Sequence, residues 1–170
     1  MTGPYSWVMA KRFSVVTALL AALAGAAVAN ADADPPAPQL GAACSPELAD
    51  TMTLLPDEQT YAVCSESGAV DVWSAVQTPF EPSDSWLSYG PSMTLHGQGM
   101  RNPNLTSGSW TATPQDPQTV CRAVQKPVVA AGVLGIPEVS ESQPGEPLTL
   151  RLPPNLFSIE ISGNCLWTRV

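Results

Sequence analysis

Proline is the residue that most restricts how this chain can fold. The sequence contains 18 prolines among 170 residues, and few segments between them are long enough for a helix of three turns. Proline ends helices because it lacks an amide proton and its ring clashes with the preceding turn. The segments between prolines show short runs of alternating apolar and polar residues, the pattern of half-buried strands. The sequence therefore predicts an all-β fold, a small disulfide-stapled sandwich or barrel, with room for one short N-terminal helix starting after Ser45.

The predicted strands are short and separated by turn residues. Residues 51–54 and 60–63 flank Pro56-Asp57, a pair that favours a turn, so they predict a hairpin. Further strands are predicted at residues 70–76, 86–89, 92–95, 109–112, 120–124, 128–133 and 148–152.

The clearest strand pattern lies at the end of the chain. Residues 156–161 alternate between apolar and polar side chains, and Ser162-Gly163-Asn164 after them has the composition of a turn. This order predicts a second hairpin, in which residues 165–170 return antiparallel to residues 156–161. Because side chains alternate along a strand, Phe157, Ile159 and Ile161 should share one buried face.

The first 33 residues have the three-part organisation of a secretory signal peptide. Lys11 and Arg12 precede an apolar run at residues 13–29, and small residues follow it. The run is shorter than the roughly 20 apolar residues that a membrane-spanning helix needs. We therefore expect export, with cleavage after Ala33 or, as the alternative, after Ala31, and no membrane span in the processed chain.

The processed chain is predicted to be one domain behind a short arm. Residues 34–43 carry three prolines and are expected to be extended and solvated, because proline is excluded from helix interiors and central strands. Residues 44–170 are long enough for a single hydrophobic core. After cleavage behind Ala33, five basic and fourteen acidic residues remain, a net charge of −9. Such a surface repels phosphate backbones and anionic lipid, so nucleic acid is not an expected partner.

All four cysteines lie in the processed chain, as Cys44, Cys64, Cys121 and Cys165. An even number of cysteines in an exported protein predicts two disulfides. No C-x-x-C pair is present, so neither a zinc knuckle nor a redox-active dithiol is expected. Three pairings are possible, and loop-closure entropy favours the shortest loops, Cys44–Cys64 with Cys121–Cys165. We expect no cofactor and no bound metal.

Little in the sequence points to catalysis. No G-x-S-x-G nucleophile elbow is present, and His96, in the glycine-rich stretch 95–99, is the one histidine available to a triad. Met93 and Met100 could add thioether ligands for Cu(I), but one imidazole without a free thiol makes a poor copper site. The alternative for His96 is a polar loop residue without a chemical role.

Tryptophan gives the strongest indication of a binding surface. Trp73, Trp86, Trp110 and Trp167 lie in the processed chain. Exposed indoles on a sheet could stack on sugar rings, and Trp86, His96 and Trp110 form the candidate ligand-binding set. The alternative is core packing, in which each indole N–H needs only one partner. Nearby, Asn104-Leu105-Thr106 matches a glycosylation sequon and predicts an exposed loop.

Several stretches carry a resemblance. The leader ends in Ala-Asp-Ala before Asp34-Pro35-Pro36, and the stretches that match are residues 86–91, 95–99, 104–108 and 165–169. Together they resemble a small family of secreted proteins from mycobacteria and related actinobacteria. The resemblance implies export and lineage, and it implies no activity, ligand or site residue.

The predicted function is that of a secreted, non-catalytic β protein that acts at or outside the cell envelope through protein or ligand contacts, with glycan among the ligands considered. The alternative is a secreted hydrolase that acts on cell-envelope polymer. A hydrolase would need Trp86, His96 and Trp110 to converge with a carboxylate on one concave, solvent-open patch. Buried tryptophans would favour the non-catalytic protein.

Overall fold

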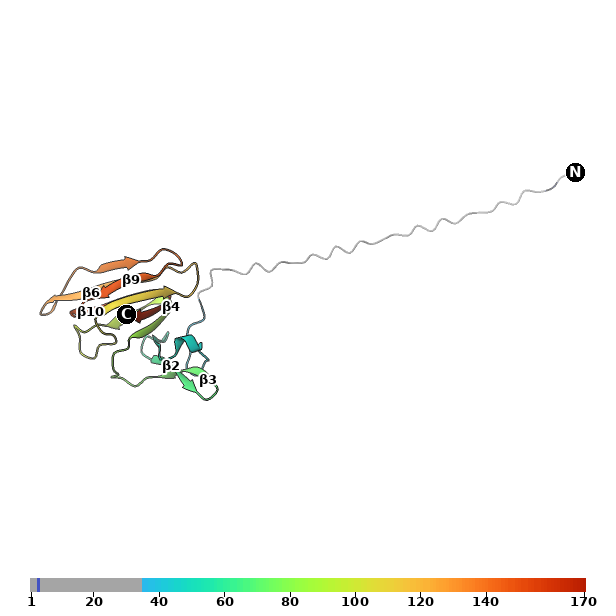
Figure 1. The fold of residues 1–170 in the computed structure, drawn as a ribbon, viewed down its shortest axis with the longest axis horizontal. Helices are drawn as coiled ribbons and strands as arrows, with labels where there is room; N and C mark the ends of the chain where they lie inside the picture. Colours follow the sequence, from blue (N-terminus) through green and yellow to red (C-terminus); the bar gives the residue numbers. More distant parts are fainter. Residues whose placement is uncertain (1–2, 4–34) are drawn as a thin grey trace. The chain divides into compact units, whose positions relative to one another are not determined.

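The computed structural model describes Gly3 and residues 35–170 (Figure 1). The signal peptide predicted over residues 1–33 lies, apart from Gly3, outside these described residues. The described part is all-β, as predicted, and its one helical element is a 3-10 turn, η1 (Pro46–Leu48). This turn follows Ser45 as predicted, although the Ser45 side chain makes no capping hydrogen bond. No helix in the described part is long and apolar enough to cross a membrane.

Ten strands are hydrogen-bonded into one mixed sheet. In chain order they are β1 (Met52–Leu54), β2 (Tyr61–Ser67), β3 (Val70–Ala75), β4 (Ser85–His96), β5 (Gly108–Pro114), β6 (Arg122–Ala130), β7 (Val133–Leu134), β8 (Glu138–Glu141), β9 (Leu148–Leu152) and β10 (Leu156–Arg169). The order across the sheet is β3-β2-β1-β4-β10-β5-β9, and β6 pairs with β10, β7 and β8. β1 and β4 are parallel, and the other pairs are antiparallel. The hairpin predicted over residues 51–63 is confirmed as β1 and β2.

The sheet divides into two branches along β10. One edge of β10 pairs with β4 over its whole length. The other edge pairs first with β6, up to Ser162, and then with β5, from Cys165 onward. Gly163 at the division has a φ of 90° and pairs with Gly90, whose φ is 123°. Both values favour glycine, because a side chain at such a φ is strained.

The prediction of a C-terminal hairpin is wrong. Residues 156–169 form one bent strand, and Ser162-Gly163-Asn164 marks an irregularity in its pairing with β4 and not a chain reversal. The runs predicted separately at residues 86–89 and 92–95 likewise form the single strand β4. The register with β6 also shifts between Leu156 and Ser158. Leu156 is consequently buried with Ile159 and Ile161, whereas Phe157 is only partly buried.

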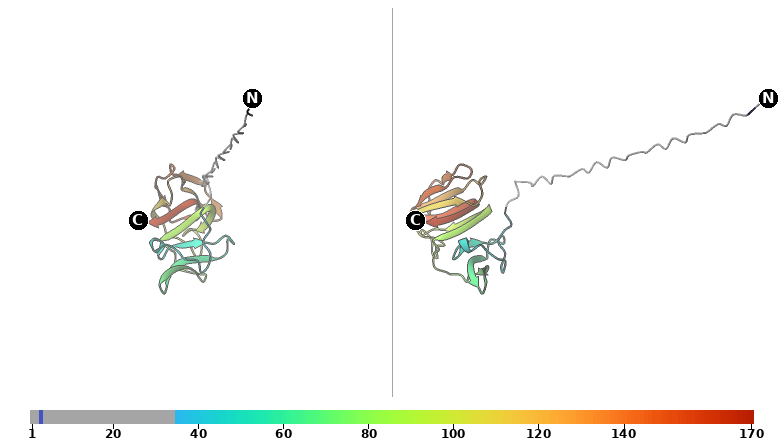
Figure 2. Two further views of the ribbon diagram at one scale, coloured as in Figure 1. Left: turned by 90° about the vertical axis from the view of Figure 1, so that its right-hand side faces the viewer. Right: turned by 45° about the vertical axis from the view of Figure 1, so that its right-hand side comes forward.

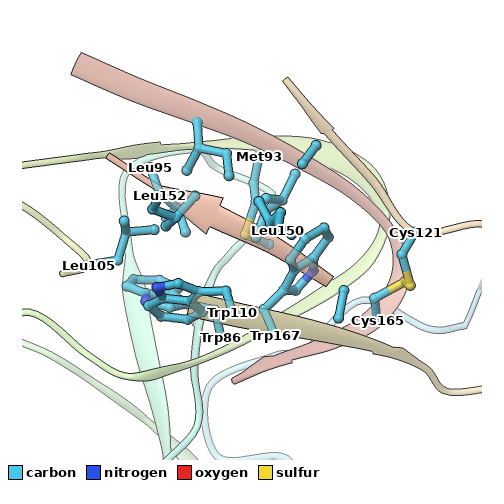
Figure 3. Packing of buried hydrophobic residues seen from close by; sticks show 14 of the residues in the cluster. Trp86, Met93, Leu95, Leu105, Trp110, Cys121, Leu150, Leu152, Cys165 and Trp167 are labelled. Atoms are coloured by element: carbon cyan, nitrogen blue, oxygen red, sulfur yellow. A yellow bond between two sulfur atoms is a disulfide. The ribbon is translucent and has the colours of Figure 1, made fainter. Parts of the chain in front are cut away.

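The main core consists of apolar side chains from β4, β5, β9 and both parts of β10 (Figure 3). Its centre holds Trp86, Trp110 and Trp167, which are 0%, 2% and 2% exposed. The Trp110 indole donates to the carbonyl of Thr106 (3.0 Å), and the Trp167 indole donates to the Ser88 hydroxyl (2.9 Å). Each buried indole removes a large apolar area from water, so these residues account for much of the stability of this region.

A second, smaller cluster lies under β2 and β3. It consists of Leu55, Ala62, Cys64, Trp73 and Leu87. Figure 2 shows β1–β3, drawn in cyan to green, at one end of the described domain. We call residues 41–76 the β1–β3 region and residues 85–170 the β4–β10 region. Each region contains one disulfide, Cys44–Cys64 and Cys121–Cys165 respectively, which confirms the predicted pairing.

The described part of the predicted arm, residues 35–43, is not simply solvated. The amide of Gly41 donates to the carbonyl of Trp73 (2.8 Å), and the amide of Trp73 donates to the carbonyl of Ala42 (3.0 Å). Pro38 is buried, and Ala37 packs against the main core. The expectation of a solvated arm fails because residues 41–43 add backbone hydrogen bonds to the free edge of β3, which covers an exposed strand edge.

Candidate functional site

The residues predicted to bind ligand do not share an open face. Trp86 and Trp110 are core residues, 0% and 2% exposed, as the alternative of core packing expected. Their indoles cannot stack on a sugar ring, because neighbouring side chains cover them. His96 is different, because it is partly exposed at the end of β4 and lines two hollows on the surface.

The two hollows share Tyr61 and His96 as lining residues, and we call the combined feature the Tyr61–His96 groove. The first hollow has a volume of about 550 Å³, and its wall includes Leu54, Glu58, Tyr89, Ser92, Met93 and Thr94. The second has a volume of about 400 Å³, and its wall includes Thr78, Phe80, Met100, Arg101, Asn102 and Asn104. A ligand that occupies both hollows must therefore pass Tyr61 and His96.

Tyr61 is held in place by aromatic neighbours. Its ring lies edge-on to Phe80 at a centroid distance of 5.0 Å and edge-on to Trp86 at 6.0 Å. Such T-shaped pairs are favourable and fix ring orientation. Trp86 therefore contributes to the groove from the core beneath it. Burial raises the pKa of Tyr61, while the hydrogen-bonding Asn104 side chain acts in the opposite direction, so the phenol stays neutral at physiological pH.

Tyr89 forms part of the first hollow in a similar way. Its hydroxyl donates to the carbonyl of Leu54 (3.0 Å), which links β4 to β1. Burial raises the pKa of Tyr89, and the negative charges of Asp57 and Glu58 raise it further. The two tyrosines thus give the groove neutral, rigid aromatic surfaces with one hydroxyl each.

The backbone of His96 is fixed by Asn104. The amide of His96 donates to Asn104 Oδ1 (2.7 Å), and the amide of Asn104 donates to the carbonyl of His96 (2.8 Å). After His96 the chain turns closely over β10. A Cβ on Gly97 would lie 2.5 Å from the carbonyl oxygen of Leu156, so the first glycine of the stretch 95–99 is required by packing.

The segment with the glycosylation sequon is packed into the protein. Asn104 is 5% exposed, and Leu105 is 3% exposed in the main core. The prediction of an exposed loop at the sequon is therefore wrong. The Asn104 side chain instead links the His96 backbone to the rest of the groove, a role that the sequon motif does not indicate.

The described residues offer little support for metal binding or acid–base chemistry in the groove. No group of three or more His, Cys, Asp or Glu side chains in residues 35–170 could hold a metal ion. Met52 and Met93 are core residues, so only Met100 joins His96 in the second hollow. Asp57, beside the first hollow, accepts hydrogen bonds from Thr60, and these hold the pKa of its carboxyl below the usual range. A carboxylate held ionised in this way is unsuited to act as a general acid.

No known protein family matches this chain. Likewise, no curated protein and no solved structure is similar to it. The case for a function therefore depends on the groove itself. Its content is three aromatic rings (Tyr61, Phe80 and Tyr89), one imidazole, several amides and hydroxyls, and one charge in each hollow, from Glu58 and Arg101.

Sequence reasoning identified His96 but missed Tyr61 and Phe80. The signal for Tyr61 was present in the alternation of residues 61–64. Ala62 and Cys64 are fully buried, so Tyr61 and Val63 must point to the other face of β2. Phe80 gave no comparable signal, because it lies between strands, in a segment without periodicity.

Proposed function

We propose that this protein is an exported, non-catalytic binding protein that holds a neutral, hydroxyl-rich ligand, such as a glycan chain, in the Tyr61–His96 groove. The observation that carries the proposal is the ridge of Tyr61 and His96 between two hollows of about 550 and 400 Å³. The two disulfides are compatible with export.

The form of the groove favours an extended ligand. Two hollows that share their dividing residues can each take one unit of a chain while the link between units crosses the ridge. A compact molecule would fill one hollow and leave the other empty. The supported aromatic rings add a further argument, because rigid aromatic side chains provide contact area at a small cost in conformational entropy.

The polar residues of the groove favour a neutral ligand. Hydroxyl and amide groups of Ser92, Thr94, Thr78 and Asn102 can donate to or accept from sugar hydroxyls. Both hollows combine apolar rings with polar groups, and the polar groups of such sites fix the orientation of a ligand. A strongly charged ligand would find only one opposite charge, Arg101 or Glu58, in either hollow.

A secreted hydrolase acting on envelope polymer remains the alternative. Glu58 and His96 line the same hollow, and hydrolysis would need a carboxylate and a histidine placed together in this way. Glycoside hydrolysis commonly uses two carboxyl groups flanking the bond, and Glu58 is the only carboxylic acid among the residues that line either hollow. Binding without turnover is therefore the better-supported function.

The test is binding of a defined panel: a neutral glucan, a mannan and a galactan, measured by affinity electrophoresis with residues 34–170. We expect retardation by at least one polysaccharide and an affinity loss of about tenfold or more, or 1.4 kcal/mol, in Tyr61→Ala and in His96→Ala. Phe157→Ala is the control, because it removes a partly buried ring from outside the groove. Retardation by none of the three, or an equal loss in Phe157→Ala, would contradict the proposal.

The same samples distinguish the alternative. New reducing ends that appear with the unaltered chain and disappear in Glu58→Gln would identify a hydrolase. Binding that survives in Glu58→Gln without any release of reducing ends is the result expected here.

A further inference from the structure

A continuous apolar segment is exposed at the end of β6. Residues 127–137 (PVVAAGVLGIP) contain no charged or hydrogen-bonding side chain and lie between Lys126 and Glu138. Val129 is 62% exposed, Val133 51%, Leu134 45% and Ile136 87%. We call residues 127–137 the apolar tip, and in Figure 1 β6 runs toward the left-hand edge of the described domain. The protein thus concentrates exposed apolar residues in one place, although its overall charge is strongly negative.

The apolar tip is a narrow ribbon and not a flat face. β6 and β7 pair at Val128 with Leu134 and at Ala130 with Val133, on either side of the turn that contains Gly132. Successive side chains on a strand point to opposite faces. Because Val128 and Val129 are both apolar, as are Val133 and Leu134, both faces of the ribbon are apolar.

This geometry distinguishes between possible partners. A second copy of the chain would add a surface on one face and leave the other face in water. A stable interface also needs roughly 1,200 Å² or more of buried surface, which a ribbon of two short strands does not present on one side. A lipid surface has no fixed shape and surrounds whatever enters it, so it covers both faces at once.

A polar hollow lies at the base of the apolar tip. Its volume is about 360 Å³, and its lining includes Pro127 of the tip together with Gln125, Glu138, Arg151 and Asn155. Gln125 is 5% exposed, and its Oε1 has no hydrogen-bond partner among the described residues. A buried polar atom without a partner is costly, so the described protein alone does not satisfy the hydrogen bonding of this hollow's lining.

We propose that the apolar tip inserts into a lipid surface and that a zwitterionic lipid headgroup occupies the hollow beside it. Arg151 provides a positive charge for a phosphate, and Glu138 provides a negative charge for an ammonium group. Insertion is shallow, because the backbone groups on the free edge of β7 need water; about 5–10 Å is typical of interfacial elements. This proposal goes beyond the glycan-binding function, because the tip and its hollow share no residue with the Tyr61–His96 groove.

The charge of the protein selects among lipids. A net charge of −9 for residues 34–170 repels anionic headgroups. Vesicles of phosphatidylcholine should therefore bind the protein, and vesicles rich in phosphatidylglycerol should bind it less. Since apolar burial drives the insertion, raising the salt concentration from 50 to 500 mM should leave binding to phosphatidylcholine nearly unchanged.

The test is flotation of residues 34–170 with phosphatidylcholine vesicles. We expect at least a tenfold loss of vesicle binding in Val133→Glu and in Ile136→Glu, both of which alter exposed side chains. Val70→Glu is the matched control, because Val70 is 58% exposed at the far hairpin of β2 and β3, and it should bind as the unaltered chain does. In an Ile136→Trp variant, brominated acyl chains should quench the fluorescence of the new tryptophan. The fluorescence of the buried tryptophans should not be quenched.

The hollow is tested separately. Arg151→Gln should weaken binding to phosphatidylcholine vesicles several-fold and leave binding to a maltoside detergent micelle, which has no phosphate, unchanged. Four results would overturn the proposal: no vesicle binding by the unaltered chain, an equal loss in Val70→Glu, equal weakening of micelle binding by Arg151→Gln, or a lipid-free dimer that Val133→Glu dissociates. Polysaccharide binding should be unaffected by the tip variants, because the tip lines neither hollow of the groove, so failure here and failure of the glycan proposal are distinguishable.

Discussion

The β1–β3 region and the β4–β10 region each contain one disulfide and one buried cluster, but they are held together differently. In the β4–β10 region, three buried tryptophans and the aliphatic residues of β9 and β10 fill the core. In the β1–β3 region, Trp73 is the one aromatic side chain of the small cluster, Met52 and Leu54 belong to the main core, and Cys44 is partly exposed. Packing therefore provides most of the stability of the β4–β10 region, whereas the disulfide and the backbone pairing provide a larger share in the β1–β3 region.

The groove lies where these two regions meet. Leu54 and Tyr61 come from the β1–β3 region, and Tyr89 and His96 come from the β4–β10 region. The two regions are joined by the pairing of Met52 with Trp86 and by hydrogen bonds such as Thr53 Oγ1 to the carbonyl of Leu87 (2.9 Å). A site at such a joint can open when the less strongly packed region moves, which is typical of binding sites.

The largest expected effect comes from removing the C-terminal end of the chain. A chain ending at Asn164 loses residues 165–170, of which residues 165–168 pair with both β4 and β5 and include Cys165 and Trp167. This loss should exceed the about 5–15 kcal/mol that stabilises a typical domain, so no cooperative thermal transition should remain. Circular dichroism during heating measures it.

The matched deletion is at the other end, in front of the β1–β3 region. A chain beginning at Leu40 loses buried Pro38 and the contact of Ala37 with the core. About 1–2 kcal/mol of apolar burial should be lost, with folding retained. The contrast between the regions would be contradicted if the chain beginning at Leu40 failed to fold, or if the chain ending at Asn164 melted normally.

The disulfides provide the second comparison. On the chain-entropy model, loops of 20 and 44 residues give nearly equal stabilisation, about 3 kcal/mol for Cys44–Cys64 and about 4 kcal/mol for Cys121–Cys165. Packing separates them, because both sulfurs of the second bridge belong to fully buried residues of the main core. Beyond the difference of about 1 kcal/mol that loop length gives, the Cys121→Ala/Cys165→Ala double variant should therefore lose about 1–3 kcal/mol more than Cys44→Ala/Cys64→Ala.

Urea denaturation of both double variants measures this difference. A difference of only about 1 kcal/mol would mean that loop entropy alone determines what each bridge contributes. In that case the two regions would not differ in packing as we describe.

Local sequence signals predicted the β1–β3 region better than the β4–β10 region. The turn at Pro56-Asp57 is built by contacts within five residues, such as Asp57 with Thr60, and the signal for it is equally local. The bend at Gly163 depends on Gly90 in a strand more than seventy residues away. Ser-Gly-Asn fits a hairpin turn and a bent strand equally well, so local composition could not distinguish them.

The same limitation applies to the candidate site. The burial of Trp86 and Trp110 follows from the way the sheet branches, and residue type alone does not determine it. His96 was identifiable because it is the only histidine of the chain. Its neighbours in the groove come from three separate segments, at Tyr61, Phe80 and residues 100–104, which only the folded chain brings together.

Two glycines with positive φ provide the third comparison. Gly163, in the β4–β10 region, has φ 90°, and an added Cβ would lie 2.3 Å from the carbonyl oxygen of Val120. Gly68, in the β2–β3 turn, has φ 75°, and an added Cβ would meet nothing within 4 Å. Gly68→Ala should lose about 1–2 kcal/mol from backbone strain alone.

Gly163→Ala should lose about 2–5 kcal/mol, because steric overlap adds to the same strain. Thermal or urea unfolding of the two variants measures the difference. A Gly163→Ala protein as stable as Gly68→Ala would show that the bend in β10 accommodates a side chain and is not enforced by close packing.

The smallest expected effect concerns two aspartates in the same local arrangement, one in each region. Asp57 and Asp116 each accept hydrogen bonds from the threonine three residues later, Thr60 and Thr119. These bonds hold the pKa of both carboxyls below the usual range of an aspartate. Asp116 also accepts from Asn164 Nδ2 (3.3 Å), which connects its loop to the bend of β10, whereas Asp57 accepts from residues of its own turn.

The sign of the pH dependence follows from the lowered pKa. A group whose pKa is lower in the folded than in the unfolded state stabilises the fold above the unfolded pKa, and this contribution is lost as the pH falls through the folded pKa. The melting temperature of Asp116→Asn should therefore lie about 1–3 °C below that of the unaltered chain at pH 7. The difference should begin to close near pH 3.8 and vanish at lower pH.

Asp57→Asn should show the same pH dependence with a smaller difference, because that carboxylate is fully exposed and connects no second element. Melting temperatures of the three proteins between pH 2.5 and 7, at about 0.1 M salt to limit screening differences, measure both effects. If Asp57→Asn melted lower than Asp116→Asn at pH 7, the turn of the β1–β3 region would depend on its carboxylate more than the bend of β10 does. The contrast between a region held by local contacts and one held by long-range packing would then apply to the cores but not to the loops.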